Sequence, residues 1–246
     1  MLQNQGRPQT IWGWPIAAYL FLAGMGAGAY VVGVAADFAG DGWRFFAQAG
    51  ITLGPPVVAV STLFLVFDLG RPMRSLRAAF RPQTSWISRG FIILTAFILV
   101  GIVHLLLWVA TPALDDADVA RRILGVVGGV LGVMTMLYTA LLLGVVRSIS
   151  FWSTPVLPVL FGVSALSTGI MAVAGVAAVS RMFVSDIQVG EEATLVAADA
   201  ALLALEAMVV TSYLYLMSNL PSARASRDVV VRGSLAPTFW LGFVAV

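Results

Sequence analysis

Apolar residues along this chain come in long runs separated by short polar segments. Six of these runs are near or above the roughly 20 residues that an α-helix needs to cross a bilayer's hydrocarbon core. The runs cover residues 12–36, 46–67, 91–110, 123–146, 155–180 and 194–217. The pattern predicts an all-α fold, a polytopic membrane helix bundle with six full transmembrane helices.

A last apolar stretch, residues 235–246, contains only about 12 residues and is too short to span the membrane. We interpret it as the start of a truncated seventh helix, and the alternative is a short docked C-terminal segment. The first run exceeds the 7–15 apolar residues of a signal-peptide core, so we expect a retained helix. The whole chain, residues 1–246, is expected to form a single membrane domain, with a core bundle at about 12–146 and further helices at 155–246.

Composition supports the membrane class and limits the redox chemistry. Hydrophobic residues make up 60% of the chain and charged residues 11%, against roughly 25% charged residues in soluble domains. The chain has no cysteine, so it cannot bind an iron–sulfur cluster through thiolates. Its one histidine, His104, excludes a haem held by two histidines of this chain. If the protein handles electrons, its redox centres would therefore lie in a partner or in a diffusible ligand such as a quinone.

Charged residues divide unequally between the two ends of the predicted helices. The N-terminus and the segments 68–90, 147–154 and 218–234 share one face and carry ten arginines against two aspartates. The opposite face, with the segments 37–45, 111–122 and 181–193, carries four arginines against eight acidic residues. We call these the basic face and the acidic face. The positive-inside rule predicts a cytoplasmic basic face, but arginines used for docking a partner would give the same bias.

Two tyrosines fall at similar depth within the predicted spans. Tyr19 lies near the basic-face end of the first span, and Tyr138 lies in the basic-face half of the fourth. Polar groups inside a membrane are costly and are therefore functional candidates. A quinone needs hydrogen-bond donors for its carbonyls and apolar walls for its ring, which these tyrosines with Trp12 and Trp14 could supply. The alternative for the two tryptophans is an aromatic belt at the membrane interface.

Three further ionisable residues lie within spans. Asp199 and Glu206 are seven residues apart, which places them on one face of a helix. In order of depth, Asp199 and His104 come first from the acidic face, then Glu206, then Tyr138. This order is the arrangement that a proton relay to a quinone would need, because quinone reduction takes up two protons with two electrons. Alternatively, Glu206 only bonds neighbouring helices or stays protonated in a dry core.

Several motifs, in order, give a resemblance to a known family. The segments DLGRP (68–72) and SWISRG (85–90), after a first helix reading WGWPIAAYLFLAGMGAGAY, resemble the NrfD/PsrC family. The resemblance continues in YTALLLG (138–144), FGVSALSTG (161–169), DAALLALE (199–206) and LAPTFWLG (235–242). Proteins of that family are the integral-membrane, quinone-reacting subunits of iron–sulfur molybdoenzyme complexes.

The resemblance implies an NrfD-like bundle of about eight helices in the inner (cytoplasmic) membrane. The implied function is electron exchange between menaquinone or ubiquinone, as a diffusible substrate, and a docked ferredoxin-like iron–sulfur subunit. That subunit would connect to a molybdopterin catalytic subunit, so this chain alone would have no complete active site. We expect no haem and no iron–sulfur cluster in the chain, contact with membrane lipid, and no nucleic-acid partner. A passive anchor and an ion-translocating subunit remain the alternatives.

The resemblance also implies where the quinone would bind. The family's quinone contacts lie at the W-x-W start of the first helix and at the tyrosine of the YT motif, which Tyr19 and Tyr138 match here. Some members have His where this chain has Tyr19 and Asn where it has Ile16. The predicted quinone-binding residues are Trp12, Trp14, Tyr19, Tyr138, Asp68 and Arg71.

The segment 67–90 carries five arginines, which is an unusual density between two apolar spans. Arginine offers forked, bidentate pairing with carboxylates and stacks on aromatic rings. We therefore expect this segment to dock the iron–sulfur subunit, and the alternative is a loop that is solvated or bound to anionic lipid head groups. The predicted docking residues are Arg74, Arg77, Arg81, Trp86 and Arg89.

Overall fold

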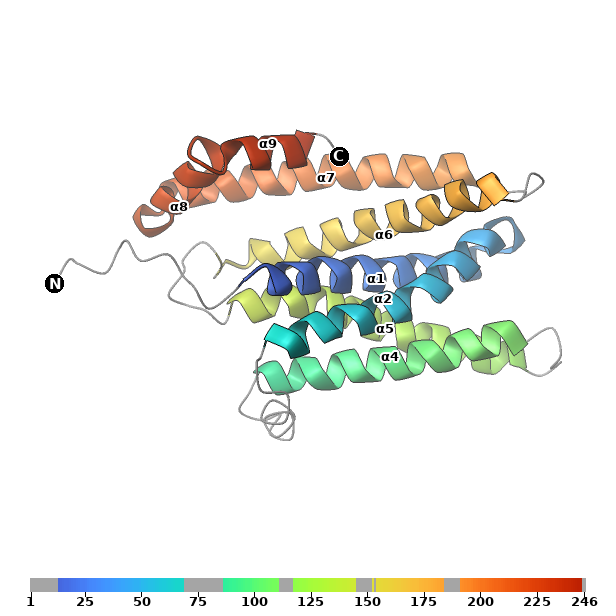
Figure 1. Cartoon of the computed structure of the whole chain (residues 1–246). Coiled ribbons are helices and arrows are strands. Elements are labelled where there is room, and N and C mark those ends of the chain that lie inside the picture. Colours follow the sequence, from blue (N-terminus) through green and yellow to red (C-terminus); the bar gives the residue numbers. More distant parts are fainter. Residues whose placement is uncertain are drawn as a thin grey trace.

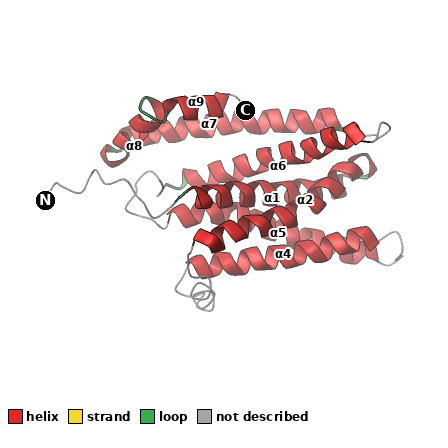
Figure 2. Cartoon of the chain, viewed as in Figure 1, coloured by secondary structure: helices red, strands yellow, loops and turns green. Residues whose placement is uncertain are grey.

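The computed structural model describes residues 13–68, 86–110, 117–144, 152, 154–183 and 191–244. Every regular element in these ranges is helical (Figures 1 and 2). The helices are α1 (Trp14–Ala39), α2 (Arg44–Asp68), α4 (Trp86–Ala110), α5 (Ala117–Gly144), α6 (Val156–Phe183), α7 (Glu192–Asn219), α8 (Pro221–Val231) and α9 (Ala236–Val244), with a short 3₁₀ turn, η1 (Asp41–Trp43), before α2.

The prediction of an all-α membrane bundle is confirmed. Among the described residues, six helices (α1, α2 and α4–α7) are long and apolar enough to cross a membrane. They run alongside one another, so that the ends of α1, α4 and α6 and the starts of α2, α5 and α7 gather at the acidic face (Figure 1). Helix α4 begins at Trp86, earlier than the predicted residue 91, so most of the SWISRG motif forms the first turn of a helix.

Helix α1 is the centre of the bundle, and its boundaries follow from its sequence. A proline sits in its first turn, where the missing N–H costs nothing. It ends at Ala39 and is followed by Gly40, whose φ of 111° is a conformation that residues with a side chain rarely adopt. Between these points α1 packs against α2, α5 and α6. The remaining elements are therefore arranged around this one helix.

Glycines let the backbones of α1 and its neighbours come very close. A Cβ added at Gly28 of α1 would lie 1.8 Å from the carbonyl oxygen of Ala165 on α6. A Cβ at Gly50 of α2 would lie 2.3 Å from the carbonyl oxygen of Ala29. Such contacts bring helices together in lipid, where no hydrophobic drive acts between them. Helix α7 is attached differently, because it packs on α6 and α8.

This packing gives a matched pair of substitutions. Gly28→Ala should destabilise the protein by ~1–3 kcal/mol, because the added methyl group overlaps backbone that must shift. Gly24→Ala, one turn away, should be tolerated, because its Cβ would lie 3.5 Å from the side chain of Ala165 in ordinary contact. The thermal unfolding midpoints of both variants, purified in the same detergent, measure the difference. Equal midpoints would contradict the close α1–α6 crossing.

Candidate functional site

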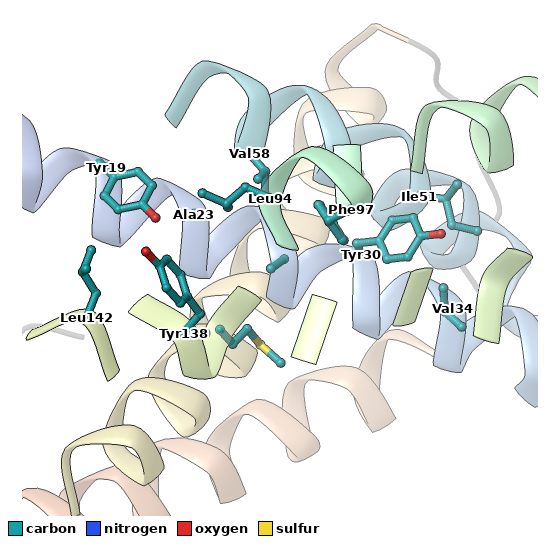
Figure 3. Packing of buried hydrophobic residues seen from close by; sticks show 13 residues of the cluster. Tyr19, Ala23, Tyr30, Val34, Ile51, Val58, Leu94, Phe97, Tyr138 and Leu142 are labelled. Atoms are coloured by element: carbon teal, nitrogen blue, oxygen red, sulfur yellow. The ribbon is translucent and has the colours of Figure 1, made fainter. Parts of the chain in front are cut away.

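Tyr19 of α1 and Tyr138 of α5 meet in the interior of the bundle, with their hydroxyl groups pointing toward one another (Figure 3). Both side chains are buried, with 0% and 3% of their surface exposed. The ring of Tyr138 lies against Gly90 of α4, where a Cβ would fall 1.8 Å from the Tyr138 Cζ atom. The glycine of the SWISRG motif thus leaves the room that this tyrosine occupies. Three helices therefore define the position of the pair.

The hydroxyl of Tyr19 is buried and has no hydrogen-bond partner among the described residues. Buried hydroxyl groups are normally bonded, so such a group calls for an explanation. Apolar side chains form its surroundings, among them Ala23, Leu94 and Leu142 (Figure 3). The site thus offers two phenol groups in an apolar setting. That combination suits a hydrophobic ligand with an oxygen that accepts hydrogen bonds.

The other predicted quinone-binding residues lie toward the helix ends or outside the described residues. Trp14 is in the first turn of α1, is 74% exposed, and contacts Phe64 of α2 edge to face at 6.1 Å between ring centroids. Its exposed position also fits an interfacial aromatic belt. Trp12, Arg71 and the side chain of Asp68 lie outside the described residues. The structure therefore brings Tyr19 and Tyr138 together and leaves Trp14 at the edge.

Two of the predicted docking residues form a pair on the first turn of α4. The Arg89 guanidinium lies over the ring of Trp86, 4.8 Å from its centroid. Both side chains are exposed at the basic face. The remaining docking residues, Arg74, Arg77 and Arg81, lie outside the described residues.

Asp199 and Glu206 both face α6, on the side of the bundle formed by α6 and α7. The Ser167 hydroxyl donates a hydrogen bond of 2.8 Å to Asp199 Oδ1, and the aspartate is buried. Glu206 is half-buried and lies near Ser164 of α6. It lines a mostly apolar groove of about 370 Å³ between α1, α6 and α7, together with Phe21. The two carboxyl groups therefore share the side of α7 that packs on α6, but only Glu206 lines the groove.

His104 lies elsewhere in the bundle. Its Nδ1 atom is 2.6 Å from the hydroxyl oxygen of Tyr30 on α1, in a hydrogen bond between two buried side chains. Helix α4, which carries His104, packs on α2 and α5, whereas α7 packs on α6 and α8. The structure thus separates the three relay candidates into two groups. Sequence reasoning had not singled out Tyr30, because a lone tyrosine within an apolar run gives no sign of its partner.

Six helices that can span a membrane, among the described residues, define an integral membrane protein, and the phenol, imidazole and carboxyl groups buried between them are candidates for function. The chain belongs to the NrfD family, because the family model described as "Polysulphide reductase, NrfD" matches residues 3–246. This confirms the resemblance seen in the motifs. Within the described residues, no group of three or more histidine, aspartate or glutamate side chains gathers that could hold a metal ion.

Curated relatives support this assignment. The C component of polysulfide reductase from Wolinella succinogenes is 29% identical over 254 residues, which cover 95% of this chain and 79% of that protein. Protein NrfD of Escherichia coli is 32% identical over 65% of this chain and 57% of its own length. The C component of sulfite dehydrogenase from Allochromatium vinosum is 34% identical over 36% of this chain and 30% of its own. No solved structure matches the chain significantly.

Proposed function

We propose that this chain is the quinone-reacting, membrane-anchoring subunit of a multi-subunit oxidoreductase. It would exchange electrons between menaquinone or ubiquinone in the inner (cytoplasmic) membrane and a docked ferredoxin-like iron–sulfur subunit. The observation that carries the proposal is the buried pair of Tyr19 and Tyr138, whose hydroxyl groups face each other in apolar surroundings. The names of two relatives, components of a polysulfide reductase and of a sulfite dehydrogenase, support an oxidoreductase complex.

The two phenol groups would hold the head group of the quinone. Each carbonyl oxygen of a quinone accepts hydrogen bonds, and it gains negative charge as electrons arrive. A donor such as the Tyr138 hydroxyl stabilises that charge most strongly where water is excluded. The unpartnered Tyr19 hydroxyl would gain an acceptor on the same ligand. The pair would thus both orient the quinone and favour its reduced form.

Electrons would reach the quinone from outside this chain. The chain contains no cysteine, so a thiolate-bound cluster must belong to a partner. The exposed Trp86–Arg89 pair suits an acidic partner, and we expect the arginines that precede it in the sequence to contribute to the same docking surface. Through that partner, a molybdopterin catalytic subunit would complete the complex.

Two alternatives assign the interior groups differently. In a passive anchor, the tyrosines would only pack, yet the buried Tyr19 hydroxyl would then remain without a partner among the described residues at a cost in stability. In an ion-translocating subunit, the carboxyl groups of Asp199 and Glu206 would carry the function. We propose that these two carboxyl groups instead form a proton route of the quinone-reacting subunit, with Ser167 bonded to Asp199 and Ser164 beside Glu206.

Tyr138→Phe tests the quinone site. The change removes one hydroxyl and keeps the ring that fills the space at Gly90, so the fold should be retained. Losing the donor should cost ~1–3 kcal/mol, and quinone-linked turnover of the complex should fall while turnover with a soluble artificial dye is unchanged. Tyr213→Phe, at a buried tyrosine of α7, is the control. An equal loss in both assays would make Tyr138 structural.

Glu206→Gln tests the proton route on α7. Glutamine keeps the size and the hydrogen bonding of the side chain but removes the titrating group, so assembly should be unchanged and quinone turnover should slow. Proton uptake from the acidic face, measured in oriented vesicles, should fall as well. Glu192→Gln, at an exposed position of the same helix, is the control. Wild-type turnover and sidedness in Glu206→Gln would leave only a packing role.

Charge reversal tests the docking surface. Arg74→Glu with Arg77→Glu should release the soluble subunits from membranes while this chain stays inserted, because like charges then face an acidic partner. Arg224→Glu with Arg232→Glu, in another segment of the basic face, is the matched control. Immunoblots of washed membranes measure retention. Partners that remain bound after the first reversal would rule the docking role out.

A further inference from the structure

A polar pocket opens at the acidic face, among the ends of α1, α2, α4 and α5. It has a volume of about 350 Å³ and is lined by three aspartates, three arginines, a glycine and Trp108. Its residues come from the end of α1, the start of α2, the end of α4 and the start of α5. Six charged side chains around one hollow favour water inside it.

The floor of this pocket is an ion pair. Arg121 Nη1 lies 2.5 Å from Asp37 Oδ1, and the two side chains are only 13% and 10% exposed. The same guanidinium lies over the ring of Trp108, 5.2 Å from its centroid. One helical turn deeper, about 5.4 Å along each helix axis, stand His104 on α4 and Gly125 on α5. His104 therefore lies directly beneath the charged floor.

His104 has one bonded and one unbonded ring nitrogen. Nδ1 is bonded to Tyr30, while Nε2 is buried and has no partner among the described residues. Nε2 faces Gly125, where a Cβ would lie 3.5 Å away. The charges of Asp37 and Arg121 are near enough to act on the imidazole. The free nitrogen thus lies on the same side of α5 as the pocket floor.

Helix α5 leaves room for Tyr30 as well. A Cβ at Gly128 would fall 2.2 Å from the Tyr30 hydroxyl oxygen. On the same face of α5, seven residues farther along, Thr135 is fully buried, and its hydroxyl donates to the carbonyl oxygen of Leu131. Tyr138 follows within one further turn. Polar groups therefore recur along one face, from the pocket to the tyrosine pair.

We infer that the pocket, His104 and Tyr30 form a proton inlet from the acidic face toward Tyr19 and Tyr138. Water in the pocket would give a proton to Nε2, Nδ1 would pass its proton to the Tyr30 oxygen, and the phenol would release its own proton inward. The histidine is then neutral again, with the proton on Nε2. This inference rests on the proposed quinone chemistry, which consumes those protons. The inlet is separate from the Asp199 and Glu206 groups on α7.

His104→Gln and Tyr30→Phe test the inlet in the assembled complex. Glutamine can still bond Tyr30 but cannot relay a proton, and phenylalanine keeps the edge-to-face contact with Phe97 at 5.2 Å. Each change should lower quinone-linked turnover by about ten-fold or more and reduce proton uptake from the acidic face, with dye turnover unchanged. Tyr213→Phe should behave as wild type.

The outcomes separate this inlet from the quinone proposal. If Tyr138→Phe lowers quinone turnover but His104→Gln and Tyr30→Phe keep wild-type rate and sidedness, the inlet is wrong and the quinone site stands. If all three variants match wild type, the quinone proposal fails and the inlet has no proton-consuming site to serve.

A second measurement does not depend on quinone. His104 is the chain's single histidine, so deuterium exchange at its ring C2–H can be read by mass spectrometry from one peptide. A water-filled inlet predicts exchange in the folded protein. Gly125→Val places a branched side chain against the Cε1–Nε2 edge of the ring and should slow that exchange several-fold. Equal exchange in the wild type and in Gly125→Val would overturn the inlet.

Discussion

The close contact between the backbones of α1 and its neighbours is the constraint on which the rest of this structure depends. At Gly28 and Gly50 there is no space for even a methyl group, so the depth and rotation of α1 relative to α6 and α2 are closely fixed. Because α1 carries both Tyr19 and Tyr30, this fixed register also sets where two interior hydroxyl groups lie. In lipid, the hydrophobic effect does not hold helices together, so the free energy of association has to come from direct packing between them.

Glycine has a second role in the bundle, which is to leave space for polar rings. Gly90 faces Tyr138, Gly128 faces Tyr30, and Gly125 faces His104. In each case a neighbouring helix presents bare backbone where an aromatic or imidazole ring reaches across. A large polar side chain can thus be buried between helices without pushing them apart. The polar groups of the interior therefore depend on the same residue type that brings the helices together.

The spans could be predicted because the insertion of a helix into hydrocarbon depends on its length and its apolar composition. Both properties can be read from one sequence. It also placed Tyr19 and Tyr138 at the same depth, because depth follows from position along a spanning helix. Depth alone does not give the direction in which a side chain points around its helix. For that reason His104 was grouped with Asp199 and Glu206, although it bonds Tyr30 on another side of the bundle. The partners of Asp37 and Asp199 were missed for the same reason.

The contact between Gly90 and Tyr138 has a consequence for how related sequences can diverge. The ring of Tyr138 fills the space that a side chain at position 90 would need. Neither position 90 nor position 138 can therefore change freely while the other stays as it is. Replacing the tyrosine with a small residue would open a void, and a larger residue at position 90 could then fill it. Sequences that replace the aromatic ring with a small side chain are therefore expected to lose the glycine as well. Positions 90 and 138 should therefore covary across the family.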